Sequence, residues 1–257
     1  TQLANLTQLT WLSLSNNQLR GNIPSELGNL TNLTVLFLGA NQFSGNIPSQ
    51  LGSLTHLITL VVGYNQLSGS IPTQLGNLTN LNWLDVNVNQ LSGNIPTQLT
   101  QLTKLSYLSL SGNQLSGNVP AQLGNLINLT ELHLNDNGFD GALPGTFTNL
   151  THLVLFWFNN TNLCEPRDTA FQSWLVGIPN LQRTTLCPAN ITVQFGAATY
   201  TVNENGQVGG FQEVTLSAPS SQIVTTRFTT SNGTATAGND YQPQDTTLTF
   251  NPGETSK

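Results

Sequence analysis

LTVLFLGANQFSGNIPSQLGSLTH, Leu33 to His56, is a phrase that the chain repeats every 24 residues. Copies follow one another without insertion or deletion, and they open at Leu9, Leu33, Leu57, Leu81, Leu105, Leu129 and Leu153. A fixed period of roughly 20–50 residues indicates stacked units, none of which can bury a core by itself. We therefore expect the first part of the chain to be a solenoid, which offers a long surface to a partner.

The spacing inside one copy predicts its local structure. Apolar residues such as Leu36 and Leu38 alternate along a short strand that is buried on one side. Asn41 follows the strand, and its side chain can form hydrogen bonds with the turn that each stacked copy repeats. Pro48 fixes the next bend. The residues expected to point back into the core are Phe43, Ile47, Leu51 and Leu54.

These leucine, asparagine and proline positions resemble the leucine-rich repeat in its plant-specific form. The resemblance implies an α/β solenoid over residues 1–163, a right-handed superhelix with a parallel sheet on its concave side. Thr161 replaces the asparagine of the seventh copy, so we expect the asparagine ladder to end there. Leu6 belongs to the tail of a preceding copy, and no cap stands before it. Because an uncapped repeat exposes its apolar face, we expect either that this end self-associates or that upstream sequence has been removed.

A segment bracketed by Cys164 and Cys187, the two cysteines of the chain, follows the last repeat. Phe171 and Leu175 have helical spacing in it and are expected to cover the open end of the solenoid. Residues 164–189 resemble the cysteine-paired C-terminal cap of plant-type repeats, and this resemblance implies a disulfide between the two cysteines. Such a bond would place the protein in an oxidising compartment, whereas two reduced thiols are the alternative.

Residues 190–257 lack the repeat and contain short strand-like runs between turn residues, which predicts a small all-β sandwich. GTATAGNDY (Gly233–Tyr241), followed by LTFNPGET (Leu248–Thr255), resembles a Calx-β domain. The family binds Ca²⁺ through acidic groups, and Glu204 and Asp240 stand at two of those positions. Because the chain stops before the last strands of the family, we expect an incomplete sandwich and an incomplete calcium site, with an edge open to self-association.

Charge limits the classes of partner. The chain has six basic and twelve acidic residues, a formal net charge of −6 and no cluster of lysine and arginine. This composition disfavours binding to nucleic acid or to an anionic membrane, and no apolar run is long enough to insert into a bilayer. Plant-type repeats joined to a Calx-β module resemble secreted or cell-surface proteins of bacteria, which implies an extracellular location.

The outward side chains of the concave strands are the candidate binding surface, because the repeat does not constrain them. Aromatic residues gather there with a few charges, and Trp83 and Tyr107 are expected to form a central apolar platform. Such a surface suits a protein, a peptide or an oligosaccharide, although packing between neighbouring strands would also account for some aromatic residues. The candidate ligand-binding residues are Phe37, Tyr64, Trp83, Asp85, Tyr107, Glu131, His133, Asp136 and Trp157.

An enzymatic alternative uses Asp85, Ser109, Glu131, His133 and Asp136. A catalytic triad needs its histidine in the middle, but the strand order places Ser109 between Asp85 and His133. Glu131 or Asp136 could instead orient His133. Glu131 could also form a carboxylate pair for glycoside hydrolysis with Asp136 or with Asp85. Glu131, His133 and Asp136 together could hold a metal ion. No nucleophile elbow or oxyanion loop is visible. We therefore expect a recognition module rather than an enzyme, with a carbohydrate-active hydrolase, a glycosidase or an esterase, as the alternative.

Overall fold

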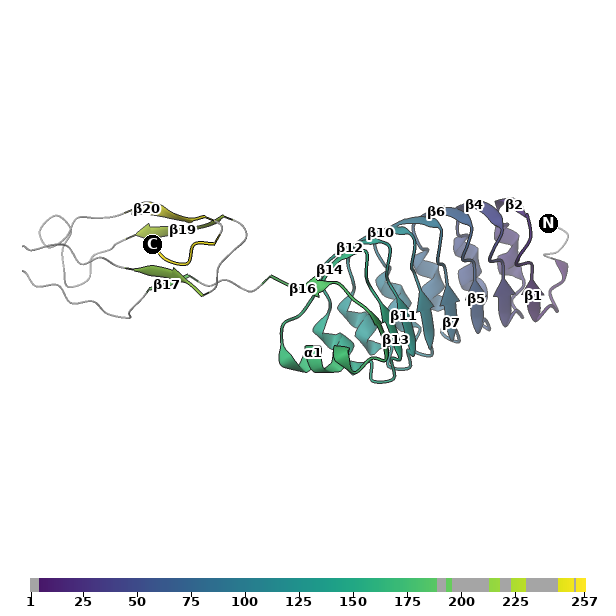
Figure 1. The fold of residues 1–257 in the computed structure, drawn as a ribbon. Helices are drawn as coiled ribbons and strands as arrows, with labels where there is room; N and C mark the ends of the chain where they lie inside the picture. The colour runs from purple at the N-terminus through teal and green to yellow at the C-terminus, as the bar shows by residue number, and fades with distance from the viewer. Residues whose placement is uncertain (1–4, 189–192, 196–212, 218–222, 230–244, 252) are drawn as a thin grey trace, which may run out of the picture. The chain divides into compact units, whose positions relative to one another are not determined.

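The structure is a computed structural model that describes residues 5–188, 193–195, 213–217, 223–229, 245–251 and 253–257 (Figure 1). The chain divides into two compact units, Thr1–Cys187 and Pro188–Lys257. The cap that the sequence places at residues 164–189 lies almost entirely within the first unit. Among the described residues, no helix has the length and apolarity that a membrane span requires.

One strand from each repeat joins a parallel sheet of eight strands, which we call the first sheet (Figure 1). Its strands, in spatial order, are β1 (Trp11–Ser13), β3 (Val35–Phe37), β5 (Thr59–Val61), β7 (Trp83–Asp85), β9 (Tyr107–Ser109), β11 (Glu131–His133), β13 (Leu155–Trp157) and β15 (Asn180–Gln182). Equivalent positions of successive repeats pair directly, for example Trp83 with Tyr107. This parallel, in-register arrangement confirms the predicted leucine-rich repeat solenoid.

A second parallel sheet of eight strands runs along the same repeats. Its strands are β2 (Arg20–Asn22), β4 (Gln42–Asn46), β6 (Gln66–Gly69), β8 (Gln90–Gly93), β10 (Gln114–Asn118), β12 (Gly138–Ala142), β14 (Asn162–Glu165) and β16 (Thr185–Leu186). Sequence reasoning predicted only the first sheet, because the QLSGN phrase lacks the β-branched residues typical of strands. Stacking of identical repeats brings these segments together instead.

Short 3₁₀ helices form the helical side of the repeats. They are η2 (Ser25–Asn29), η3 (Ser49–Ser53), η4 (Thr73–Asn77), η5 (Thr97–Gln101), η6 (Ala121–Asn125) and η7 (Gly145–Asn149). A proline immediately precedes each one and sets its entry, as Pro48 does for η3 at φ −64°. Segments of five residues are too short for a stable α-helix, which explains the tighter turn.

The core of the first unit contains the predicted apolar residues of each repeat, including Phe43, Ile47 and Leu51. An asparagine ladder joins the repeats beside this core. Asn65 donates from Nδ2 to the carbonyls of Leu38, Val62 and Gly63, and its Oδ1 accepts from the backbone N–H of Phe43. Thr161, at the equivalent position of the last copy, bonds only within its own turn, to Phe158 and Leu163.

The C-terminal cap closes the last repeat. Cys164 and Cys187 form a disulfide, as predicted. Helix α1 (Thr169–Val176) buries Phe171 and Leu175 against the core. The fully buried carboxylate of Glu165 pairs with the Arg183 guanidinium, an ion pair that sequence reasoning missed.

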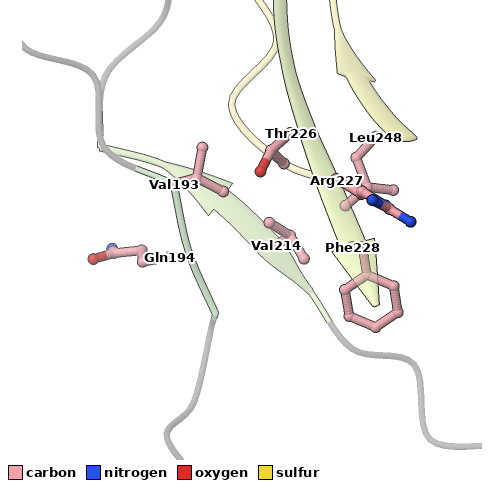
Figure 2. Close-up of a pocket in the computed structure, with 7 residues that line it drawn as sticks. All are labelled: Val193, Gln194, Val214, Thr226, Arg227, Phe228 and Leu248. Carbon is pink, nitrogen blue, oxygen red and sulfur yellow. The ribbon is translucent and has the colours of Figure 1, made fainter. Parts of the chain in front are cut away.

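The second unit consists, in its described part, of two antiparallel strand pairs: β17 (Val193–Phe195) with β18 (Val214–Leu216), and β19 (Val224–Thr229) with β20 (Asp245–Phe250). Val214, Leu216 and Phe250 form a small core. A cavity of about 210 Å³ lies between the pairs, lined by side chains from both (Figure 2). It is smaller than usual ligand pockets of about 300–1,000 Å³.

The calcium prediction rests on residues outside the described part of the second unit. Glu204 and Asp240 both lie there. Calcium binding through these two carboxylates stays a prediction.

Candidate recognition face on the first sheet

Two rows of outward side chains cross the first sheet, and together they make what we call the first-sheet face. The strand register aligns both rows without a break. The first row is Trp11, Val35, Thr59, Trp83, Tyr107, Glu131 and Leu155, and the second is Ser13, Phe37, Val61, Asp85, Ser109, His133 and Trp157. The pairing therefore aligns equivalent positions of successive repeats in each row.

Four aromatic rings form a continuous path over four adjacent strands of this face. The rings of Trp83 and Tyr107 are stacked, with centroids 3.7 Å apart and an interplanar angle of 4°. The Tyr107 ring lies 5.3 Å from the His133 ring, which meets Trp157 edge-on at 5.0 Å. The path therefore crosses from the first row to the second between β9 and β11.

The other aromatic pair of the face lies apart from this path. Trp11 and Phe37 pack edge-on at 5.5 Å, and Trp11 is 57% exposed. Thr59 and Val61 of β5 separate the pair from Trp83. Phe37 and Trp83, both proposed as ligand contacts from the sequence, thus belong to separate clusters.

Asp85 is a partly buried carboxylate next to the stacked rings. Burial raises the pKa of Asp85, while a hydrogen bond from the backbone N–H of Asn87 at 3.0 Å and the nearby His133 lower it. Burial has the largest effect, so the ionised form is less stable here than in water. A partly buried carboxylate with a raised pKa is typical of binding sites.

Nearby negative charges affect the pKa of Tyr107. Burial, followed by the charge of Asp85, raises the pKa of Tyr107 to about 12, and the charge of Glu131 adds to the increase. A hydrogen bond with Ser109 acts in the opposite direction. Two carboxylates therefore act on one phenol at the centre of the aromatic path.

Glu131, His133 and Asp136 come from the same repeat but have different partners. The Glu131 carboxylate lies 3.3 Å from Nε2 of His133. Asp136 is held by Nδ2 of Asn135 at 2.5 Å and by Nδ2 of Asn160 at 2.7 Å. No three His, Cys, Asp or Glu side chains in the described ranges are grouped closely enough to hold a metal ion.

Ser109 is not arranged as a nucleophile. Its side chain is 1% exposed, and its Oγ lies 3.3 Å from Oγ of Ser111. His133 is oriented by Glu131, but the serine that it would activate is buried in the sheet. This geometry does not favour the hydrolase alternative.

Tyr64 and Val88 follow β5 and β7 in the left-handed backbone region, with φ of 54° and 46°. Both side chains are exposed. Such a conformation is unusual for bulky residues and for β-branched ones above all. Strained residues often lie at binding sites, so both residues remain candidates for ligand contact.

Three asparagines occupy the seventh position of their repeats, Asn87, Asn135 and Asn159. Their Oδ1 atoms are buried and have no hydrogen-bond partner in the described part of the chain. A Cβ on Gly63 would lie 2.1 Å from the Asn87 Oδ1, so this oxygen occupies the space that the glycine leaves. Sequence reasoning gave no role to Gly63, since only the stacking reveals its neighbour.

Family comparisons divide the chain in the same way as the fold. The leucine-rich repeat region family matches residues 1–106, the leucine-rich repeat family matches residues 104–126 and 128–150, and the Calx-beta domain family matches residues 188–257. No curated protein sequence is similar to the chain.

Solved structures similar to the chain include plant receptor ectodomains. The ectodomain of the receptor kinase GASSHO1/SCHENGEN3 from Arabidopsis thaliana, in complex with Casparian strip integrity factor 2, is 37% identical, with a TM-score of 0.61 over 64% of this chain and 19% of that one. The plant peptide hormone receptor RGFR1, in complex with RGF2, has the same identity, TM-score and coverage of this chain, which spans 26% of the receptor.

A bacterial structure is also similar. A leucine-rich repeat protein of Leptospira interrogans is 27% identical, with a TM-score of 0.58, and the match covers 72% of this chain and 44% of that one. The chain spans less than half the length of all three of these proteins. The sequence matches, the parallel sheets and these structures together identify a chain of leucine-rich repeats followed by a Calx-beta domain.

Proposed function

We propose that the chain is an extracellular recognition module that binds a peptide segment of a partner along the first-sheet face. The main support for this proposal is the continuous path of aromatic rings formed by Trp83, Tyr107, His133 and Trp157. Aromatic side chains of this kind provide most of the binding energy at protein interfaces. Two similar structures are described as complexes, RGFR1 with RGF2 and the receptor kinase HAESA with an IDA peptide hormone, which supports a peptide as the partner.

The extracellular location rests on the disulfide, because such bonds persist in oxidising compartments. We also propose plant-specific-type repeats and secretion from, or display on, a bacterial cell. The joining of these repeats to a Calx-beta domain and the similarity to a Leptospira protein support this source. Self-association through the N-terminal repeat or the edge of the second unit stays a prediction.

A selection from a random peptide library tests the function. The full chain is immobilised in three forms: wild type, Trp83→Ala and Trp11→Ala. Trp11 is the matched control, because it occupies the same row but lies outside the aromatic path. We expect wild type and Trp11→Ala to bind the same selected peptides, and Trp83→Ala to bind them at least about tenfold more weakly, equal to about 1.4 kcal/mol.

Two outcomes would contradict this function. If no peptide is enriched, or if Trp83→Ala and Trp11→Ala bind the selected peptides equally well, the first-sheet face does not bind peptides. Oligosaccharides are the other class of partner that stacked aromatic rings can bind. Binding of the same three proteins to an oligosaccharide array tests this alternative. Binding to a glycan that Trp83→Ala abolishes, without peptide enrichment, would replace the peptide proposal.

A further inference from the structure

Tyr107 stacks on one face of the Trp83 ring, and among the described residues no other ring packs against Trp83. Trp83 and Tyr107 are neighbours in the first row, on adjacent strands, and their rings stack in parallel. The planes of both rings are therefore roughly perpendicular to the direction of the row. The uncovered face of Trp83 is therefore directed along the row towards β5, where its neighbour is the much shorter Thr59. Trp83 is 37% exposed. This arrangement leaves a flat indole face open beside a small side chain.

The Asp85 carboxylate is on the same side of β7 as this open indole face. A Cβ on Gly63, in the repeat of β5, would lie 3.1 Å from Oδ1 of Asp85 and 2.1 Å from Oδ1 of Asn87. Both oxygens therefore lean from the repeat of β7 towards the repeat of β5. The Asn87 oxygen is buried and has no donor among the described residues.

Neither row of the first-sheet face contains a lysine or an arginine. In the described part of the first unit, Lys104 donates to Oδ1 of Asn80, Arg183 pairs with Glu165, and Arg20 belongs to the second sheet. His133, whose ring lies against Tyr107 and Trp157, interacts electrostatically with Asp85. A cationic ligand would supply the missing partner for Asp85.

We infer that the first-sheet face selects peptides that carry a lysine or arginine side chain, with its cation against the open face of Trp83 and beside the carboxylate of Asp85. An indole face is the best aromatic partner for a cation, and an adjacent carboxylate adds an ion pair. The exposed Tyr64 follows β5 in the same repeat as Thr59. This inference rests on the proposed function, since it names the chemistry of the ligand at that face.

The test uses two synthetic peptide pools that differ at one position. One pool has lysine at a fixed central position and the other has norleucine, a neutral side chain of similar length; every other position is random among uncharged residues. Each pool is equilibrated with the immobilised full chain as wild type, Asp85→Asn, Trp83→Ala and Asp140→Asn. Asp140 is the matched control, because it is an exposed carboxylate on β12 of the second sheet.

We expect the lysine pool to bind wild type and Asp140→Asn about tenfold more tightly than the norleucine pool. In Asp85→Asn this preference should shrink several-fold, because the ion pair is lost and only the contact of the cation with the Trp83 ring remains. Asn is nearly isosteric with Asp and its Oδ1 can keep the hydrogen bond from Asn87, so this variant should fold, which its thermal unfolding curve checks.

The outcomes separate this inference from the function on which it rests. Equal binding of the two pools to wild type, with Trp83→Ala weakening both, would overturn the cationic ligand and leave peptide recognition in place. A lysine preference of the same size in Asp85→Asn as in wild type would also overturn it. Binding that is the same in wild type and Trp83→Ala for both pools would remove the proposed function itself.

Discussion

The eighth residue of each repeat adopts the left-handed backbone conformation. The residues are Asn16, Ala40, Tyr64, Val88, Gly112, Asp136 and Asn160. Glycine, asparagine and aspartate tolerate positive φ, whereas a β-branched residue is strained there by about 1–2 kcal/mol. Val88 is thus a position where the sequence conflicts with the turn that the repeat imposes.

Replacing Val88 with asparagine should raise the free energy of unfolding by about 1 kcal/mol, because the strain is relieved. Urea unfolding followed by tryptophan fluorescence measures it. The matched control is Ile58→Asn, which also removes an exposed β-branched side chain, but at a position without positive φ. An equal change in the two variants would show that lost hydrophobic exposure, rather than backbone strain, is responsible.

Asp85 should decrease stability at neutral pH, because burial raises its pKa in the folded state. When the folded pKa of an acid is raised, the unfolded state loses its proton first, so stability falls as pH rises from the unfolded value through the folded value. We therefore expect Asp85→Asn to be more stable than wild type at pH 7.

The excess stability of Asp85→Asn should shrink as pH falls through the raised folded-state pKa of Asp85. It should be gone below the ordinary aspartate value of about 3.9, where the wild-type carboxyl is protonated in both states. Urea titrations of both proteins over this pH range supply the comparison. A pH-independent difference would mean that the substitution acts through packing and not through charge.

At the scale of elements, the asparagine ladder holds neighbouring repeats together. Asn65 bonds carbonyls of its own turn and also bonds Leu38 of the preceding repeat and Phe43. The side chain of Asn17, in the first copy, donates to Leu14 and Ser15 of its own turn and to no other described residue. The same residue type therefore makes inter-repeat bonds in one place and local bonds in the other.

Asn65→Ala should lower the free energy of unfolding by about 2–4 kcal/mol, since it leaves backbone groups of two repeats without partners. Asn17→Ala, the matched control, should cost less than about 1 kcal/mol, because its turn is exposed. Chemical denaturation of both variants measures the difference. Equal losses would indicate that the asparagine acts within its turn and that the inter-repeat bonds add little.

At the scale of the whole molecule, the two units should unfold separately. All four tryptophans, Trp11, Trp83, Trp157 and Trp174, lie in the first unit, so their fluorescence reports on that unit alone. The disulfide joins residues 23 positions apart in the same unit. Circular dichroism, in contrast, reports on both units.

Replacing Cys164 and Cys187 together with serine should lower the stability of the first unit by about 3 kcal/mol, because a closed loop of this size restricts the unfolded chain. The tryptophan-detected midpoint should fall, and any transition seen only by circular dichroism should stay in place. Wild type under reducing conditions is the control and should resemble the variant. A simultaneous shift of both transitions would show that the units are coupled.

The repeat, the solenoid and the alignment of side chains in rows were all determined by the sequence alone. A constant period of 24 residues places equivalent positions of successive copies side by side, so Trp83 and Tyr107 could be predicted as neighbours before any coordinates. The cysteine-bonded cap and the β-rich second unit followed from resemblance to known families. In each case the information is local or periodic, and stacking only repeats it.

Only the tertiary structure decided which side-chain atoms of those rows are exposed and can contact a ligand. The second sheet forms from segments with little strand propensity, because each is aligned by the repeats on both sides of it. Ser109 is buried and Glu165 finds Arg183 through contacts between residues distant along the chain. The open face of Trp83 depends on the small Thr59 in the next repeat, and side-chain packing of this kind has no period that a sequence can display.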